Sequence, residues 1–400
     1  MTTSSSSSPS SLDNVKLPDT ERILLGPGPS PVSPRVMRAM VAPVLSHLDA
    51  NMLALMDDVR ERLGRVFKAS ESSFSLAVSG TGSAGMECAV SNLVREGTHV
   101  LSVVGGYFGD RLADVCLRQG ALVNRLEVPW GRAVDPDAIR RALKGSGVDV
   151  ITVVHAETST GVLNPVDAVA DVAREFGALT LVDAVTSLGA HPVDVNGWGL
   201  DAVYSCSQKG LGAPSGLAPV TFGAAARERA RAGNRSFYFD LGLLEQYWLN
   251  RKYHHTISAP LVYALREALL MVEEEGLDER WARHRRHHLV LAAGLGAMGL
   301  ELLPPEGERL WTLNAVCVPD GVDEARVRRF LLEQFNLEVG AGLGPLAGRI
   351  WRVGLMGSGS SSQLILLFVS ALERALRAQD YPVTPGTGTA AAGDALSSFR

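Results

Sequence analysis

Short apolar segments alternate with amphipathic helical segments between residues 74 and 222, and this alternation constrains the fold more than any other feature of the chain. The apolar segments predict seven strands, at residues 74–79, 99–104, 122–128, 150–155, 179–183, 202–205 and 217–222. Helical patterns separate several of them, at residues 85–95, 110–119, 136–143 and 165–176. Such alternation is typical of an α/β fold in which helices flank a mostly parallel sheet.

The length of 400 residues predicts two structured domains, because a single hydrophobic core stops growing at about 250–300 residues. We expect a large domain over residues 21–275 and a smaller C-terminal α+β domain over residues 276–378. Residues 1–20 are rich in Ser and Pro, and residues 379–400 are rich in Thr, Gly and Ala. Both of these end segments are therefore predicted to be disordered.

The balance of charges and cysteines excludes several classes of partner. The formal net charge is −5, so no basic excess points to nucleic acid or to an anionic membrane surface. No apolar run reaches the ~18–20 residues that span a bilayer, and the N-terminus lacks the apolar core of a signal peptide, so we expect a cytoplasmic protein. The four cysteines are scattered without a CxxC pair, which predicts neither a zinc site nor a disulfide framework.

One predicted helix carries histidines at a spacing that metal ligands also use. Its charged and titratable residues include Arg280, Arg283, His284, Arg285, Arg286, His287 and His288. The arginines would repel a metal ion, so we predict a solvated basic helix face and no metal site.

The glycine-rich segment Ser79–Gly85 follows a predicted strand and opens a predicted helix. Backbone N–H groups around Gly82 at the helix N-terminus attract an anion, and Thr81 and Ser83 add hydroxyl donors. A phosphate site is the functional interpretation, and a turn without a ligand is the alternative. The segment also satisfies the dinucleotide-binding pattern GxGxxG, but the next strand ends at Val103–Gly106 without the carboxylate that this fold requires.

Three charged residues lie at or near predicted strands, whose carboxyl ends bind ligands in open parallel sheets. Asp183 closes a strand, where it can cap a helix, bind a metal or pair with a cationic ring nitrogen. Lys209 lies among small and polar residues, and burial would favour the neutral amine that forms a Schiff base. Arg352 is a natural partner of a carboxylate, with an internal salt bridge as the alternative. Pyridoxal 5′-phosphate (PLP) accounts for all three residues and for the phosphate site, with an amino-acid substrate supplying the carboxylate.

Six motifs in a fixed order make the chain resemble a known family. They are Leu24–Pro29, Ser79–Gly85, His155–Gly161, Val182–Val185, Ser207–Lys209 and Tyr253–Thr256. Over about residues 21–378 the chain resembles the class V aminotransferases of PLP fold type I, and within them the alanine–glyoxylate and serine–glyoxylate (serine–pyruvate) aminotransferases. The resemblance implies the PLP cofactor, a seven-stranded sheet in the large domain, and a homodimer whose sites are shared across the interface.

The resemblance also implies a role for each matching residue. Lys209 would be the Schiff-base lysine, Asp183 the partner of the pyridine nitrogen, and Arg352 the residue that binds the substrate carboxylate. Phe108, at a position where the family often has tryptophan, and Val185 would pack on the cofactor ring. The other implied ligands are Thr158 for the phenolic oxygen, Thr81, Gly82, Ser83 and Gln208 for the phosphate, and Tyr253 and Thr256 for the phosphate of the neighbouring subunit's cofactor.

The implied activity is a ping-pong transfer of an amino group from a small amino acid, alanine or serine, to a small 2-oxo acid, glyoxylate or pyruvate. The same chemistry on a larger amino donor stays open, as does a non-catalytic binding protein that keeps the fold. A cysteine desulfurase or selenocysteine lyase fits less well, because Gln208 replaces the usual histidine before Lys209 and the loop 340–348 has no cysteine. A nicotinamide-dependent oxidoreductase would leave Lys209 and Arg352 without a role.

Overall fold

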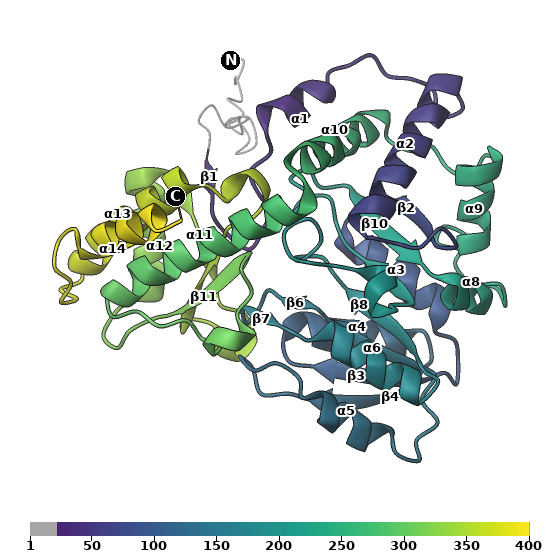
Figure 1. The fold of residues 1–400 in the computed structure, drawn as a ribbon, viewed down its shortest axis with the longest axis horizontal. Coiled ribbons are helices and arrows are strands. Elements are labelled where there is room, and N and C mark those ends of the chain that lie inside the picture. Colours follow the sequence, from purple (N-terminus) through teal and green to yellow (C-terminus); the bar gives the residue numbers. More distant parts are fainter. Residues whose placement is uncertain (1–21, 400) are drawn as a thin grey trace, which may run out of the picture.

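A seven-stranded sheet forms the centre of the larger part of the molecule (Figure 1). The computed structural model describes residues 22–399, so the segment 1–20 that was predicted to be disordered lies outside the described residues. The strand order is β2-β10-β9-β8-β5-β3-β4, and β10 runs antiparallel to both of its neighbours while the other pairs are parallel. The strands are β2 (Phe74–Ser79), β3 (His99–Val104), β4 (Leu122–Glu127), β5 (Val150–Val154), β8 (Leu179–Asp183), β9 (Ala202–Tyr204) and β10 (Leu217–Phe222). The predicted α/β fold with a mostly parallel sheet is confirmed.

Most of these strands are apolar along their whole length because helices cover both faces of the sheet. Every residue of β5 and every residue of β10 is buried. The edge strand β4 differs, since none of its residues is fully buried. Four strands have the predicted bounds, and the other three end one residue earlier than predicted.

The helices that surround the sheet bury their apolar sides in its core. Helix α2, which was not predicted, contributes Met52, Met56, Val59 and Leu63 to this core. The carboxylate of Asp49 caps it by accepting a hydrogen bond from the N–H of Asn51 at 2.8 Å. The helices of this part are α1 (Pro34–Ala39), α2 (Ala50–Val66), α3 (Gly82–Leu93), α4 (Tyr107–Arg118), α5 (Pro136–Leu143), α6 (Val166–Glu175), α7 (Val195–Trp198), α8 (Ala224–Ala230), α9 (Leu241–Asn250) and α10 (Ala259–Glu275).

A smaller α+β part follows and has a hydrophobic core of its own. Its antiparallel sheet has the order β11-β14-β13, and the short strand β1 near the start of the described chain pairs in parallel with β12 of this part. Its elements are α11 (Leu277–Ala297), β11 (Leu313–Cys317), α12 (Glu324–Phe335), β12 (Leu337–Glu338), β13 (Gly340–Ala341), β14 (Ile350–Gly354) and α13 (Ser362–Arg377), with β1 at Ile23–Leu24. A hairpin of β6 (Ala156–Glu157) and β7 (Val162–Leu163) lies beside β11. A domain boundary near residue 275 stays a prediction.

The prediction of a disordered C-terminal tail is wrong, because residues 387–397 form helix α14, which packs along α11 (Figure 1). Large apolar side chains are scarce in α14, which is why its composition predicts disorder. Its Ala392 is nevertheless fully buried, and the carbonyl oxygen of Gly388 lies 3.1 Å from the position that a Cβ on Gly294 of α11 would occupy. The buried carboxylate of Glu373 accepts a hydrogen bond from the N–H of Gly388 at 2.6 Å and stabilises the N-terminus of α14.

The predicted solvated basic face of α11 is wrong for Arg280 and the three histidines, although Arg285 is exposed as predicted. The exposed fractions of Arg280, His284, His287 and His288 are 5%, 0%, 6% and 4%. These side chains are buried at the junction between the larger and the smaller part, and burial lowers the pKa of each of the three histidines, which keeps them neutral. Over residues 22–399 no cluster of three or more His, Cys, Asp or Glu side chains is arranged to hold a metal ion. No helix in that range combines the length and the apolar character that a membrane crossing demands.

Replacing Ala392 by Asp tests whether α14 is packed as described. The new carboxylate would lose its hydration between α14 and α11 without gaining a partner. We expect Ala392→Asp to lower the free energy of unfolding by about 2–4 kcal/mol. Urea unfolding followed by circular dichroism measures this loss.

Ala390, on the exposed side of the same helix, is the matched control. Ala390→Asp should change the free energy of unfolding by less than about 0.5 kcal/mol. Equal and small effects of the two substitutions would contradict the packing of α14 on α11.

Candidate active site

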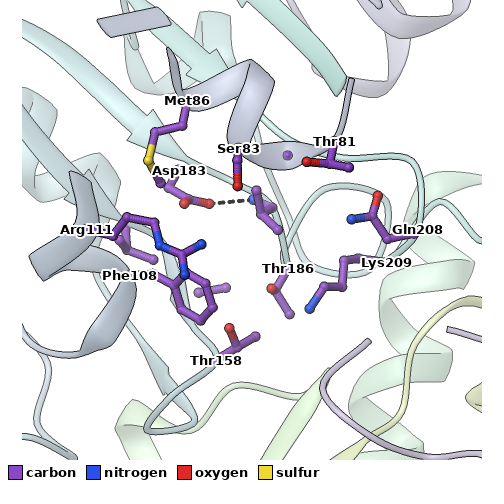
Figure 2. Close-up of a pocket in the computed structure, with 14 residues that line it drawn as sticks. Thr81, Ser83, Met86, Phe108, Arg111, Thr158, Asp183, Thr186, Gln208 and Lys209 are labelled. Atoms are coloured by element: carbon purple, nitrogen blue, oxygen red, sulfur yellow. Dashed lines mark hydrogen bonds between the residues drawn. The ribbon is translucent and has the colours of Figure 1, made fainter. Parts of the chain in front are cut away.

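One pocket lies beyond the carboxyl ends of the parallel strands, at the edge where ligands bind in open sheets (Figure 2). The loops that follow β2, β8 and β9 reach it, together with the first turns of α4. Its lining residues are Thr81, Gly82, Ser83, Met86, Phe108, Arg111, Val154, Ala156, Thr158, Asp183, Val185, Thr186, Gln208 and Lys209. Nine predicted site residues are thus brought together, whereas Arg352, Tyr253 and Thr256 do not line the pocket.

The glycine-rich segment forms the N-terminus of α3 at one end of this pocket. Thr81 is the N-cap residue, and its side chain makes no capping hydrogen bond. Figure 2 shows the hydroxyls of Thr81 and Ser83 on the pocket side. A Cβ on Gly82 would lie 3.1 Å from Cys206 and 3.3 Å from Val185, so only glycine brings the backbone this close. Hydroxyls, first-turn N–H groups and the helix dipole together make this end an anion site.

Lys209 enters the pocket from the loop after β9, held by the N-terminal segment of the chain. Its amine donates a hydrogen bond to the carbonyl oxygen of Pro27, and the hydroxyl of Ser30 donates to the carbonyl oxygen of Lys209 at 2.9 Å. A Cβ on Gly28 would lie 2.5 Å from Lys209 Cε, and the φ of +119° also favours glycine there. Burial, with a smaller contribution from Arg352, lowers the pKa of Lys209 and favours the neutral amine.

Asp183 ends β8 and lines the same pocket as Lys209 (Figure 2). Its side chain is almost fully buried, and this burial raises its pKa to about 6. Its oxygens accept hydrogen bonds from the N–H of Val185 at 2.8 Å and from the hydroxyl of Tyr204 at 2.7 Å, which partly offset the effect of burial. Tyr204 was read from the sequence only as a strand residue. The carboxylate is therefore fixed in place and suited to a cationic partner inside the pocket.

Apolar and hydroxyl side chains form the walls between the anion site and Lys209. They are Met86, Phe108, Thr158, Val185 and Thr186. Arg111, one helical turn after Phe108, places its guanidinium 5.2 Å from the centre of the Phe108 ring, and Figure 2 shows the two groups side by side. Met86, Arg111 and Thr186 were not predicted, because no local motif distinguishes them from other residues of their helices and loops.

Glu157 is a buried carboxylate that anchors the start of α4 and thereby Phe108. It accepts hydrogen bonds from the N–H of Gly109 at 3.1 Å and from the hydroxyl of Ser159 at 2.5 Å. N–H groups at a helix N-terminus stabilise a carboxylate, although burial still raises the pKa of Glu157. The motif that contains Glu157 is visible in the sequence, but its contact with α4 joins segments that are far apart along the chain.

Arg352 comes from β14 of the smaller part and lies next to Thr158, one of the pocket's lining residues. Its Nε donates a hydrogen bond to the carbonyl oxygen of Ala341 at 2.7 Å, and its Nη1 donates to the carbonyl oxygen of Thr158 at 3.4 Å. The side chain is buried, and burial lowers its pKa while the nearby Glu157 raises it. The guanidinium is close enough to the pocket to lower the pKa of Lys209.

Tyr253 and Thr256 lie in the segment between α9 and α10, and both are exposed. The adjacent His255 keeps this segment next to the glycine-rich turn, because its Nε2 lies 2.8 Å from the hydroxyl of Ser79. Side chains placed in this way are free to contact another subunit.

The pocket fits PLP in charge and in hydrogen-bonding capacity. An anion site, a buried carboxylate and an amine face one space, which matches the phosphate, the ring nitrogen and the aldehyde of PLP. The side-chain oxygen of Gln208 is buried there without a hydrogen-bond partner. An anion only accepts hydrogen bonds, so Gln208 could bind one through its amide N–H groups and not through this oxygen.

Comparisons with known proteins agree with this geometry. The chain matches the family model described as Aminotransferase class-V over residues 24–348. It is 37% identical over 395 residues to the (S)-ureidoglycine–glyoxylate transaminase of Bacillus subtilis (strain 168), which covers 93% of this chain and 95% of the relative. The crystal structure of ureidoglycine–glyoxylate aminotransferase from Bacillus subtilis gives a TM-score of 0.93 at 37% identity and covers 96% of this chain and 100% of that chain.

Two further relatives carry a different name. The alanine–glyoxylate aminotransferase of Drosophila melanogaster is 35% identical over 365 residues, covering 89% of this chain and 92% of the relative. The crystal structure of an alanine–glyoxylate aminotransferase from Nostoc sp. gives a TM-score of 0.88 at 45% identity and covers 91% of this chain and 98% of that chain.

The raised pKa of Asp183 predicts a pH dependence of stability in the cofactor-free protein. Between the ordinary value of 3.8 and the folded-state value of about 6, the folded protein holds this proton more tightly than the unfolded chain. Stability should therefore fall as the pH rises through this window, by about 3 kcal/mol for about two pKa units. Asp183→Asn keeps the shape but does not titrate, so it should remove this decline.

Urea unfolding at pH 4 and at pH 7 measures the effect. Asp183→Asn should be more stable than the wild type at pH 7 and should lose that advantage at pH 4. Parallel changes of the two proteins between these pH values would show that Asp183 titrates normally.

Proposed function

Because the chain belongs to the class V aminotransferases, a family of PLP-dependent transferases, we propose that it moves an amino group from a small amino acid to a small 2-oxo acid. The proposed donors are alanine and serine, and the proposed acceptors are glyoxylate and pyruvate. The observation that carries this proposal is the convergence of Lys209, Asp183 and the N-terminus of α3 on one pocket. These groups offer the amine, the counter-charge and the anion site that PLP requires.

Each part of the cofactor has a proposed partner among the lining residues. Asp183 pairs with the protonated ring nitrogen, Phe108 and Val185 pack on the ring, and Thr158 donates to the phenolic oxygen. The phosphate ligands are Thr81, Gly82, Ser83 and Gln208. When bound, PLP supplies an electron sink that stabilises the negative charge left on the substrate's Cα.

Lys209 moves the proton in the proposed reaction. Because its pKa is lowered by burial, its Nζ takes the proton from the Cα of the amino donor and in the second half-reaction gives a proton to the Cα of the new amino acid. Asp183 stays ionised opposite the ring cation, because an opposite charge lowers the pKa of a carboxyl group. Arg352 binds the α-carboxylate through its fork of N–H groups and so orients the Cα–H bond. Donor and acceptor use one site in turn, which gives ping-pong kinetics.

The walls of the pocket select the donor's side chain, because Arg352 recognises only the α-carboxylate. The aromatic side chain of Phe108 in the pocket wall favours small donors such as alanine and serine. Similarity to a ureidoglycine–glyoxylate transaminase makes (S)-ureidoglycine a second candidate. Its ureido group needs polar partners, and Arg111 and Thr186 offer them on the pocket wall. Glyoxylate is an acceptor common to both candidates.

The proposed assembly is a homodimer in which each subunit completes the other's site. Exposed apolar residues on the surface around the segment 253–256 include Leu48 (45%), Phe237 (67%) and Tyr253 (56%). Ring contacts tie this surface to the segment, since the ring centroids of His47 and Tyr253 lie 4.9 Å apart and the ring of Phe237 stacks on that of His254. An apolar surface of this kind is expected at an interface. A second copy of the chain would cover it and bring Tyr253 and Thr256 to the partner's phosphate site.

The proposed chemistry predicts a reversible absorbance change in each half-reaction. PLP-loaded protein should lose its cofactor band on addition of alanine or serine and regain it on addition of glyoxylate or pyruvate. Lys209→Ala should reduce kcat by about 10²–10⁴-fold, since both proton transfers need the amine. Stopped-flow absorbance with a panel of donors, including (S)-ureidoglycine, measures these steps.

Lys144, on an exposed turn after α5, is the matched control, and Lys144→Ala should keep wild-type kinetics. Wild-type protein that binds PLP but shows no half-reaction with any donor would point instead to a non-catalytic binding protein. Normal turnover by Lys209→Ala would end the proposed mechanism.

Subunit mixing tests the shared site. Lys209→Ala protein and protein carrying both Tyr253→Ala and Thr256→Ala should each be inactive at limiting PLP. A mixed dimer contains one site with Lys209, Tyr253 and Thr256 all native, so activity should return when the two proteins are refolded together. Each lost phosphate contact should weaken PLP binding about tenfold or more.

Mixing that restores no activity, although native mass spectrometry shows mixed dimers, would place all of these residues in one subunit's own site. A monomer at assay concentrations would contradict the proposed assembly directly.

A further inference from the structure

Arg280, near the start of α11, joins three segments at the junction between the two parts of the molecule. Its side chain is 6% exposed. Its Nε donates a hydrogen bond to the carbonyl oxygen of Gly189 at 2.7 Å, and its Nη2 donates to that of Gly210 at 2.8 Å. Its Nη1 donates to the carboxylate of Glu275 at 2.6 Å. The planar guanidinium thus holds two backbone carbonyls in fixed relative positions.

The two carbonyls belong to the loops that carry the proposed catalytic pair. The aspartate loop is residues 184–190, directly after Asp183, and it contains Gly189. The lysine loop is residues 205–213, and in it Gly210 directly follows Lys209. Arg280 itself lines no part of the pocket, so it can act on the site only through these loops.

The aspartate loop and the lysine loop touch closely at both ends. Next to the sheet, the hydroxyl of Ser205 donates to the carbonyl oxygen of Ala184 at 2.9 Å. At the far end, a Cβ on Gly210 would lie 2.4 Å from the carbonyl oxygen of Leu188. Arg280 binds at this far end, where no strand pairing holds the loops together.

The charge of Arg280 is balanced by a carboxylate that a second arginine shares. Glu275, the last residue of α10, also accepts a hydrogen bond from Nη2 of Arg283 at 3.0 Å. Arg283 donates further to the carbonyl oxygens of Ser360 at 2.7 Å and Gly357 at 3.2 Å. Arg283 therefore uses the same carboxylate as Arg280 but contacts a turn of the smaller part instead of the two loops.

We propose that Arg280 is a positioning residue that sets the separation of Asp183 and Lys209 by clamping the aspartate loop to the lysine loop. The inference rests on the proposed function, in which one cofactor ring spans these two side chains. An arginine suits the task because its fork reaches two carbonyls at once, whereas a lysine ammonium is a single point of contact. Loss of the clamp lets the loops separate without removing any group that touches cofactor or substrate.

Hydrogen–deuterium exchange of the cofactor-free chain tests the clamp without any measurement of activity. The proteins are the wild type, Arg280→Met, Arg280→Lys and the control Arg283→Met. Arg280→Met should raise exchange in both loops about tenfold, as expected when a charge-assisted hydrogen bond is lost. Arg280→Lys should restore part of the protection. Arg283→Met should raise exchange near residues 357–360 and leave the aspartate loop as in the wild type.

PLP-loaded protein provides the second measurement. Arg280→Met should lower kcat about 10–100-fold with little change in the KM of the amino donor, because binding groups stay and reacting groups are misplaced. The pH midpoint of the cofactor's absorbance band should shift as well, since it reports the electrostatic surroundings of Lys209 and Asp183. Arg283→Met should keep both quantities close to wild type.

Wild-type exchange in both loops of a folded Arg280→Met protein would overturn the proposal. Equal losses of kcat in Arg280→Met and Arg283→Met would also overturn it, because the effect would then belong to the whole junction. If the wild type binds no PLP, the proposed function fails, and the exchange measurements still decide whether Arg280 clamps the two loops.

Discussion

The burial of a carboxylate and an amine in one pocket is the constraint on which the rest of the structure depends. Burial raises the pKa of Asp183 and lowers that of Lys209, so it disfavours the charged form of both groups. Fixed donors and acceptors replace water around them, namely the N–H of Val185, the hydroxyl of Tyr204 and the carbonyl oxygen of Pro27. Because β8 and β9 are hydrogen-bonded neighbours in parallel, both groups reach the same edge of the sheet. A cationic ring between them would turn an unfavourable burial into a favourable ion pair.

Most of the seven strands could be predicted from the sequence because strands buried on both faces are apolar along most of their length, and this is a local property; the edge strand β4 is the exception. The missed features depend on partners that are distant in the chain. Helix α14 has little apolar surface, and Gly294 lets it approach α11 closely. The basic residues of α11 form a pattern that is typical of a solvated face, but Arg280 finds acceptors on two loops of the other part. Composition cannot show that such a surface is covered.

The predictions for the site divide in the same way, between residues set by local motifs and residues set by contacts with distant segments. Residues within short motifs, such as Thr81, Asp183 and Lys209, could be placed because a strand end and a glycine turn fix their surroundings locally. Glu157 and Arg280 could not be assigned roles, because each acts through a contact between segments far apart in the sequence. No short sequence motif marks positioning residues of this kind. Only the folded arrangement shows which backbone groups they hold.

The N-terminal segment explains why a motif far from the central strands belongs to the family pattern. It pairs with β12 through β1, and the carbonyl oxygen of Leu25 accepts a hydrogen bond from the N–H of Gly354 at 2.8 Å, at the end of the strand that carries Arg352. A few residues later, Gly28 lies directly against the side chain of Lys209. Arg352, the proposed partner of the substrate carboxylate, and the backbone that restrains the lysine are therefore joined in one unit, whereas the proposed phosphate site at α3 belongs to the sheet. Movement of the smaller part on substrate binding would thus change the surroundings of Lys209 without changing the proposed phosphate site at the N-terminus of α3.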